Sequence, residues 1–182
     1  ASVTIAYRGT GPLRGRIPLR AIAVFPSWDV MGFAVHKSTG ITALSQINKE
    51  RFPLRLSTGP VGRRDMIESP VTFMVHAAVK AAGFTVAELR NWGGKIQTVS
   101  RPSHPDRRAG IENGTIDAVF DEGIKSWGQT ALDHGFHYLP IDGPVLKRLK
   151  AMGYRAGVVP KSHFKGMARD VRTVAGLPSP LG

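Results

Sequence analysis

The chain has no cysteine, which excludes disulfide bonds and thiolate metal ligands. No uninterrupted apolar run approaches the ~20 residues that a membrane-spanning helix needs. Acidic residues are also few: 13 stand against 25 lysines and arginines, so the formal net charge is +12. The hydrophobic fraction of 42% is ordinary for a globular protein, and 182 residues suffice for one domain or two small lobes.

The excess positive charge lies at the two ends of the chain. Residues 1–64 carry 10 basic and 2 acidic side chains, residues 65–140 carry 7 and 9, and residues 141–182 carry 8 and 2. No basic run with interleaved aromatic residues and no nucleic-acid-binding motif occurs, so we expect a solvated basic surface and no nucleic-acid partner. A chain separated from an acidic partner segment would show the same distribution.

The hydrophobic pattern predicts alternating strands and helices. Two buried strands, Leu19–Phe25 and Val30–Lys37, flank the turn Pro26–Asp29. A helix is expected from Ser69 as N-cap, with Pro70 at its first position and a glycine stop at residue 83. Further strands are expected within 52–59, 95–100, 115–123, 136–142 and 155–160, and helices within 39–47, 105–114, 124–135 and 143–154. This order predicts an α/β fold with a mostly parallel sheet covered by helices.

The first candidate site is the glycine-rich connection after the strand that ends near residue 58. In open α/β sheets, ligands bind outside the carboxyl ends of strands, where helix N-termini point. Gly62, Arg63, Arg64 and Ser69 offer a turn, positive charge and a helix start, which favour an anion. An ordinary, well-capped strand-to-helix loop is the alternative.

The second candidate is Asp121, Glu122 and Gly123, at another junction of strand and helix. The two carboxylates can hold an amine, a hydroxyl or a cation, and a solvated turn is the alternative. Trp127, one turn into the helix, is either a ligand contact or a core residue. Trp28, directly after a buried strand, is either a cleft-lining aromatic or a hydrophobic plug.

No catalytic constellation is evident. The six histidines show no HExxH or related metal spacing, and no GxSxG nucleophile elbow occurs. We therefore expect neither an enzyme nor a metal site or organic cofactor.

The order of motifs resembles the TAXI family, the substrate-binding receptors of tripartite ATP-independent periplasmic (TRAP) transporters. The resemblance rests on "LRAIAVFPSWDVMGFAVHKSTGITALSQI", "AAVKAAGF", "IENGTIDAVF" and "HYLPIDGPVLKRLK", and it spans almost the whole chain. It implies the type II periplasmic binding protein fold, in which two α/β lobes, each with a mostly parallel sheet, are joined by crossing strands and close on a ligand. Residues 40–139 would form lobe 2, and residues 1–39 and 140–182 would form part of lobe 1.

The resemblance also implies a function and a place. The expected protein is periplasmic, binds a small carboxylate or an amino acid between its lobes, and presents it to membrane permease subunits. Family members begin with a further glycine-rich strand-turn-helix that this sequence lacks, so we expect lobe 1 to be incomplete. The N-terminus also lacks the pattern of a signal peptide, so we expect that a signal peptide has been removed or that the chain begins within a longer protein. An effector-sensing domain of a transcription regulator and an enzyme on the same fold are the alternatives.

The chain departs from the family at both candidate sites. "GPVGRRDMIES" is longer than the family's Gly-Ser-Gly-Thr-like turn, so only Gly62 and Ser69 carry over. Asp121 and Glu122 replace small residues, and the mixture of arginines and carboxylates favours a zwitterion such as an amino acid over a plain dicarboxylate.

Overall fold

The computed structural model describes residues 6–9, 15–20, 22–23, 30–60 and 70–175. In chain order, the elements are β1 (Gly32–His36), the 3₁₀ helix η1 (Lys37–Thr39), α2 (Leu44–Glu50), β2 (Arg55–Thr58), α3 (Pro70–Ala81), α4 (Val86–Asn91), β3 (Lys95–Thr98), α5 (Pro105–Glu112), β4 (Ala118–Asp121), α6 (Ile124–Asp133), β5 (Phe136–Tyr138), α7 (Gly143–Ala151), β6 (Arg155–Val159), the 3₁₀ helix η2 (Lys161–His163) and β7 (Val171–Ala175).

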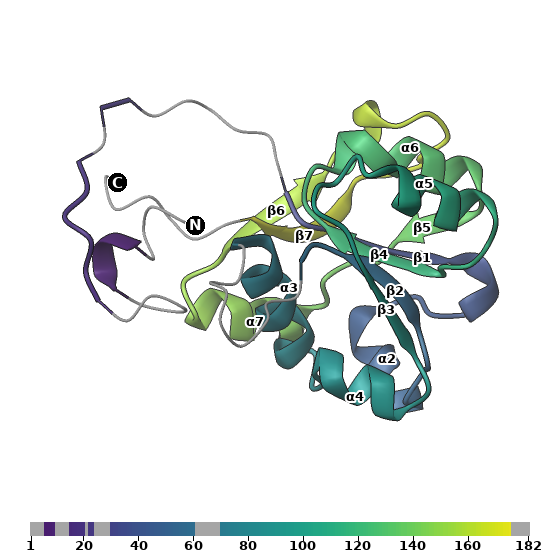
Figure 1. Cartoon of the computed structure of the whole chain (residues 1–182), viewed down its shortest axis with the longest axis horizontal. Helices are drawn as coiled ribbons and strands as arrows, with labels where there is room; N and C mark the ends of the chain where they lie inside the picture. The colour runs from purple at the N-terminus through teal and green to yellow at the C-terminus, as the bar shows by residue number, and fades with distance from the viewer. Residues whose placement is uncertain (1–5, 10–14, 21, 24–29, 61–69, 176–182) are drawn as a thin grey trace.

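A mixed five-stranded sheet in the order β3-β2-β4-β1-β5 is the centre of the fold. Strand β2 pairs in parallel with β3 and β4, whereas β1 runs antiparallel to both β4 and β5. Helices α2, α3 and α4 lie on one face, and α5 and α6 lie on the other (Figure 1). The α/β class is confirmed.

Alternating side chains of the central strands fill two cores. Phe33, Val35 and Phe120 contribute to the core beneath α2, α3 and α4, and Ala34 and Val119 contribute to the core beneath α5 and α6. Because both faces are covered, the central strands are apolar on both sides.

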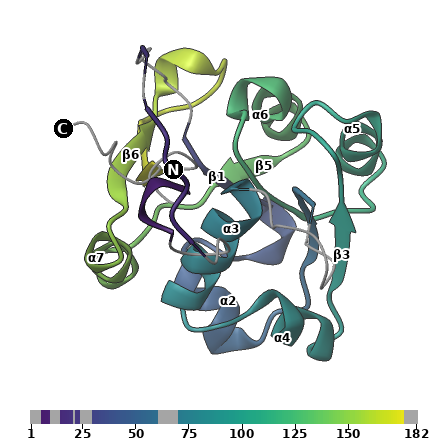
Figure 2. The same ribbon diagram turned by 60° about the vertical axis from the view of Figure 1, so that its left-hand side comes forward.

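The second sheet of the described part has two strands, β6 and β7, which pair antiparallel. Figure 2 shows β6 and α7 on the side of the molecule away from α5. The two sheets share the first core, to which Leu149, Tyr154 and Val174 belong. A mostly parallel sheet was expected in each lobe. The β6–β7 sheet is antiparallel, so the expectation is wrong there, and the large sheet is mixed, with two parallel and two antiparallel pairings, because β1 runs against both of its neighbours.

Two segments that flank strands of the large sheet are hydrogen-bonded to β7 of the second sheet. Met31, just before β1, donates its N–H to the Val174 carbonyl at 3.2 Å, and Thr173 donates its hydroxyl to the Met31 carbonyl at 2.6 Å. Beyond β5, the Leu139 N–H donates to the Phe33 carbonyl at 2.6 Å, and the Ile141 N–H donates to the Arg172 carbonyl at 3.0 Å. The chain therefore lies beside β7 both where it enters the large sheet, at Met31, and where it leaves it, at Ile141. The division into two lobes stays a prediction.

Local signals set several helix ends as expected. Helix α3 begins at Pro70 and is followed by Gly83 at φ 98°. In α7, the Asp142 carboxylate accepts from the Val145 N–H at 3.0 Å. One α-helix and one strand were missed: α4, which has a capping box between Thr85 and Glu88, and β7.

The expected strand Leu19–Phe25 is not found in its described residues. Leu19, Arg20, Ile22 and Ala23 have no strand assignment, and Ile22 is fully exposed. A strand requires a pairing partner, and no described strand pairs with these residues. The rest of that stretch lies outside the described residues.

Candidate functional site

The carboxyl ends of β2 and β4 meet the beginning of α3 at one edge of the large sheet. Thr58, the last residue of β2, lies opposite Phe120 of β4, so Gly59 and Asp121 emerge together. A methyl group added at Gly59 would lie 3.5 Å from Val71 in the first turn of α3. We call this region, from residues 57–59 and 121–123 to the first turn of α3, the carboxyl-edge site.

Beneath this edge lies a buried ion pair between Arg107 of α5 and Asp121. The exposed fraction is 0% for the arginine side chain and 2% for the aspartate. Arg107 Nη2 donates to Asp121 Oδ2, Nε donates to Ser57 Oγ at 3.1 Å, and Nη1 donates to the Pro102 carbonyl at 3.1 Å. A single guanidinium therefore joins the ends of β2 and β4 to the segment that follows β3.

The electrostatics of Arg107 follow from this burial. Desolvation lowers the pKa of Arg107 from its ordinary value, and attraction and hydrogen bonding to the Asp121 carboxylate oppose that shift. The other carboxylate oxygen, Asp121 Oδ1, accepts the Glu122 N–H at 2.8 Å. Both oxygens of Asp121 are thus engaged within the protein.

Thr58 presents a different feature on the opposite face of β2. By strand alternation, its side chain lies on the same face as Leu56, which packs in the core with α3. The Thr58 side chain is buried, at 1% exposure, and among the described residues its hydroxyl has no hydrogen-bond partner. Thr72 of α3 donates its hydroxyl to the Pro60 carbonyl, which holds the first turn of α3 against the segment after β2.

The four described residues that the sequence singled out have distinct places. Asp121 is the partner of Arg107, and Glu122 is half-buried beside it. Gly123 begins α6 at φ 61°, and a methyl group there would lie 2.7 Å from Pro102, so this glycine is required by the backbone.

Trp127 lies in the second core, at 2% exposure. Its indole N–H donates to the Glu122 carbonyl at 3.0 Å, and its ring would lie 2.8 Å from a methyl group added at Gly32. Its packing is that of a core residue that supports the carboxyl-edge site from beneath.

Trp28, Gly62, Arg63, Arg64 and Ser69 lie outside the described residues. Their assignment to the site stays a prediction.

Sequence reasoning missed Arg107, Ser57 and Thr58. A signal for Arg107 was present, because it lies three and four residues before Gly110 and Ile111, on the buried face of α5. An arginine in an apolar stripe requires a buried partner, yet the pattern does not identify Asp121 as that partner.

A second arginine–aspartate pair lies at the opposite end of β2 and β4, where these strands begin, and we call this end the amino edge. Arg55 Nε lies 2.8 Å from Asp117 Oδ2, and Asp117 Oδ1 accepts the Arg55 N–H at 2.7 Å. Here the exposed fraction is 43% for the arginine side chain and 12% for the aspartate.

In the described ranges, no group of three or more histidine, aspartate or glutamate side chains is arranged to hold a metal ion. Within the same ranges, no helix has the length and apolar character to cross a bilayer. Comparison of the chain with models of protein families and with curated proteins finds no match.

Proposed function

We propose that the protein is a periplasmic solute-binding receptor of the TAXI type, which binds a small carboxylate or amino acid and presents it to the membrane permease of a TRAP transporter. The proposal rests on the motif resemblance and on one structural observation. This observation is the buried Thr58 hydroxyl, which lacks a described partner where β2 meets the first turn of α3.

A carboxylate at this position would satisfy several groups together. The first N–H groups of an α-helix have no partner within the helix, and the helix dipole favours negative charge there. The Thr58 hydroxyl would donate to the same carboxylate, and Arg63 or Arg64 would add positive charge from the preceding segment. A buried hydroxyl without a partner costs about 1–3 kcal/mol, and a ligand acceptor would remove that cost.

The Arg107–Asp121 pair changes the expected division of roles. Because Asp121 is 1% exposed and its charge is balanced by Arg107, Asp121 does not receive a ligand amine in this proposal. Glu122, half-buried next to it, is the carboxylate that would bind the amine of a zwitterion. The ion pair acts as a positioning element that fixes the ends of β2 and β4.

The two-lobe part of the proposal draws on residues 139–141, which lead from the large sheet to α7 and the β6–β7 sheet, and on Met31, which hydrogen-bonds to β7 beside them. Hinge closure around a bound ligand would bend the chain at these residues and shift the part of the first core that both sheets share. No metal or organic cofactor takes part.

A thermal-shift screen of amino acids and C4-dicarboxylates tests the proposal. A ligand at ~1,000 times its dissociation constant adds about 4 kcal/mol to the free energy of unfolding. For a chain of this size, each kcal/mol raises Tm by roughly 2–4 °C. We expect a saturable rise with one chemical class and a smaller rise for Thr58→Val. A cooperative melt that no compound shifts contradicts the proposal.

A further inference from the structure

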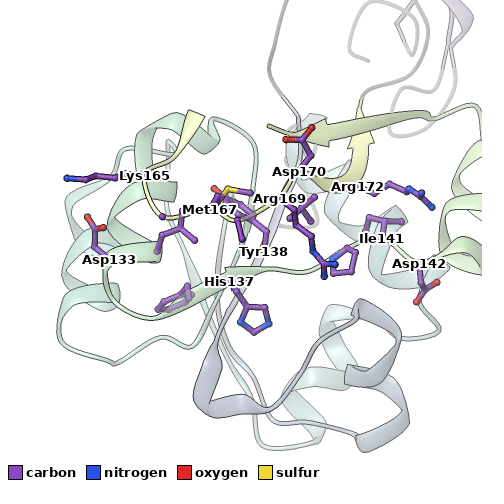
Figure 3. A pocket seen from close by; sticks show the side chains of 16 residues that line it. Asp133, His137, Tyr138, Ile141, Asp142, Lys165, Met167, Arg169, Asp170 and Arg172 are labelled. Carbon is purple, nitrogen blue, oxygen red and sulfur yellow. The ribbon is translucent and has the colours of Figure 1, made fainter. Parts of the chain in front are cut away.

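A groove of about 700 Å³ lies along β5, one of the two outer strands of the large sheet, away from the carboxyl-edge site. Residues 136–138 and 140–142 line one side, and residues 165–172 line the other. Successive side chains of a strand point to opposite faces, as His137 and Tyr138 do in Figure 3. A groove lined by successive residues therefore follows the edge of the strand. We call it the β5 groove.

The backbone of β5 leaves donors and acceptors unused along this edge. Lys37 N–H donates to the Gly135 carbonyl at 3.0 Å, and Leu139 N–H donates to the Phe33 carbonyl at 2.6 Å. In an antiparallel pair the hydrogen-bonded residues alternate, so residues 135, 137 and 139 face β1. The backbone N–H and C=O groups of Phe136 and Tyr138 point the other way, toward the groove. No described residue pairs with these groups.

The free charges of the groove are positive. The exposed side chains of Lys165, Arg169 and Arg172 form no ion pair or hydrogen bond within the described ranges. Lys165 and Arg172 lie toward opposite ends of the groove, and Arg169 extends toward β5 between them (Figure 3).

The acidic side chains of the groove already have partners. Asp133 accepts from Gln129 at 2.9 Å, Asp142 accepts from Ser45 at 2.6 Å and from the Val145 N–H, and Asp170 accepts from the Lys161 N–H at 2.8 Å. The groove therefore offers free cations and few free carboxylates.

We propose that the β5 groove binds an extended acidic segment of a partner protein, which adds to the large sheet as a strand beside β5. Strand addition uses main-chain hydrogen bonds for affinity and side-chain contacts for specificity. A peptide backbone supplies both donors and acceptors to Phe136 and Tyr138, whereas a small organic anion would leave their carbonyl groups unpaired. Glutamate or aspartate side chains on the segment would pair with Lys165, Arg169 and Arg172.

The dimensions of the groove and its charge agree with this occupant. From Phe136 to Pro140, the edge extends about 13 Å at ~3.3 Å per residue, enough for a segment of about five residues. A second copy of the chain, paired edge to edge through β5, would bring the two sets of cations together. Like charges across an interface oppose that pairing.

The test uses the ¹⁵N-labelled 182-residue chain and a capped pentapeptide of alternating glutamate and valine, with an alternating lysine and valine pentapeptide as the control. We expect saturable binding of the acidic peptide only. Amide hydrogen exchange at Phe136 and Tyr138 should slow by about tenfold or more, while exchange at His137 and Leu139 should change little.

Matched charge reversals separate the groove from the general basic surface. The double variant Arg169→Glu, Arg172→Glu should lose at least about tenfold in affinity, since exposed charges at an interface act mainly through electrostatic complementarity. Lys147→Glu with Lys150→Glu, on exposed α7 positions outside the groove, should bind as the unaltered chain does.

Three results would overturn the proposal. They are no binding of the acidic peptide, binding without protection of the Phe136 and Tyr138 amides, and protection of these amides by self-association without peptide. None of these three results depends on the carboxyl-edge site, so failure of the strand-addition proposal leaves the proposed solute-binding function intact. Conversely, the thermal-shift screen can fail while the strand-addition proposal stands.

Discussion

Strands β2 and β4 are joined at each end by an arginine–aspartate pair, and the two pairs differ mainly in their exposure to water. Arg107 and Asp121 at the carboxyl edge are almost completely buried, whereas Arg55 and Asp117 at the amino edge have side chains 43% and 12% exposed. A buried pair incurs a large desolvation cost that its Coulombic attraction only offsets, and a surface pair incurs little. The carboxyl edge is therefore the end where loss of one partner leaves an uncompensated charge.

The difference bears on function, because the buried pair lies at the end of the sheet that carries the candidate site. Arg107 bonds to Ser57, Pro102 and Asp121, and each belongs to or follows a different parallel strand. A site whose backbone is fixed in this way needs little reorganisation when a ligand binds.

The largest expected effect is that of Arg107→Met. It removes the cation and leaves the Asp121 carboxylate buried, so the free energy of unfolding should fall by about 3–5 kcal/mol. Urea denaturation followed by circular dichroism measures this change.

The matched double variant Arg107→Met, Asp121→Asn controls for the lost charge balance. It should recover much of that stability, because no uncompensated charge remains. A fall of less than about 1 kcal/mol for Arg107→Met alone would show that the pair does not hold this edge.

Alanine substitutions of one glycine at each edge, Gly32 and Gly114, should give the next largest losses of stability. In Gly32→Ala, the added methyl group would lie 2.7 Å from Ile124 and 2.8 Å from Trp127. We expect this overpacking to lower the free energy of unfolding by about 1–3 kcal/mol. Gly114 at the amino edge has open space around it and a φ of +69°, so Gly114→Ala should cost only the backbone strain of about 1–2 kcal/mol. Thermal melts of the two variants compare the costs, and a larger loss at Gly114 would contradict the account.

Arg55→Met should have the smallest effect. The Arg55 side chain is partly solvated, so its loss should cost about 1 kcal/mol or less. The cost should shrink between about 0.1 and about 1 M NaCl, because salt screens exposed charges. A salt-independent loss as large as that of Arg107→Met would remove the distinction between the two edges.

Local signals in the sequence predicted much of the fold. Pro70 and Gly83 bound α3 as expected, and the alternation at Leu54 and Leu56 places both side chains in the core. The capping box of Thr85 and Glu88 would have revealed α4. These features act over a few residues, which is why a sequence shows them.

Pairings between distant residues were not predictable in this way. The antiparallel pairing of β6 with β7 joins segments separated by η2 and the loop that follows it, and nothing in either strand specifies its partner. Arg107 lies fourteen positions before Asp121 and fifty after Ser57, so the buried contact depends on the strand order of the whole sheet. The Thr58 hydroxyl is notable only once its neighbours are known.

The most direct test of the proposed function is calorimetric titration of the compound that gives the largest thermal shift, with Thr58→Val compared with Thr115→Val. Thr115 is exposed at the amino edge, so its substitution controls for loss of a threonine hydroxyl away from the site. We expect Thr58→Val to weaken binding by about tenfold, near 1.4 kcal/mol, with no loss of stability in the absence of ligand, and Thr115→Val to bind normally. Equal affinity in both variants would contradict carboxylate binding at the carboxyl-edge site.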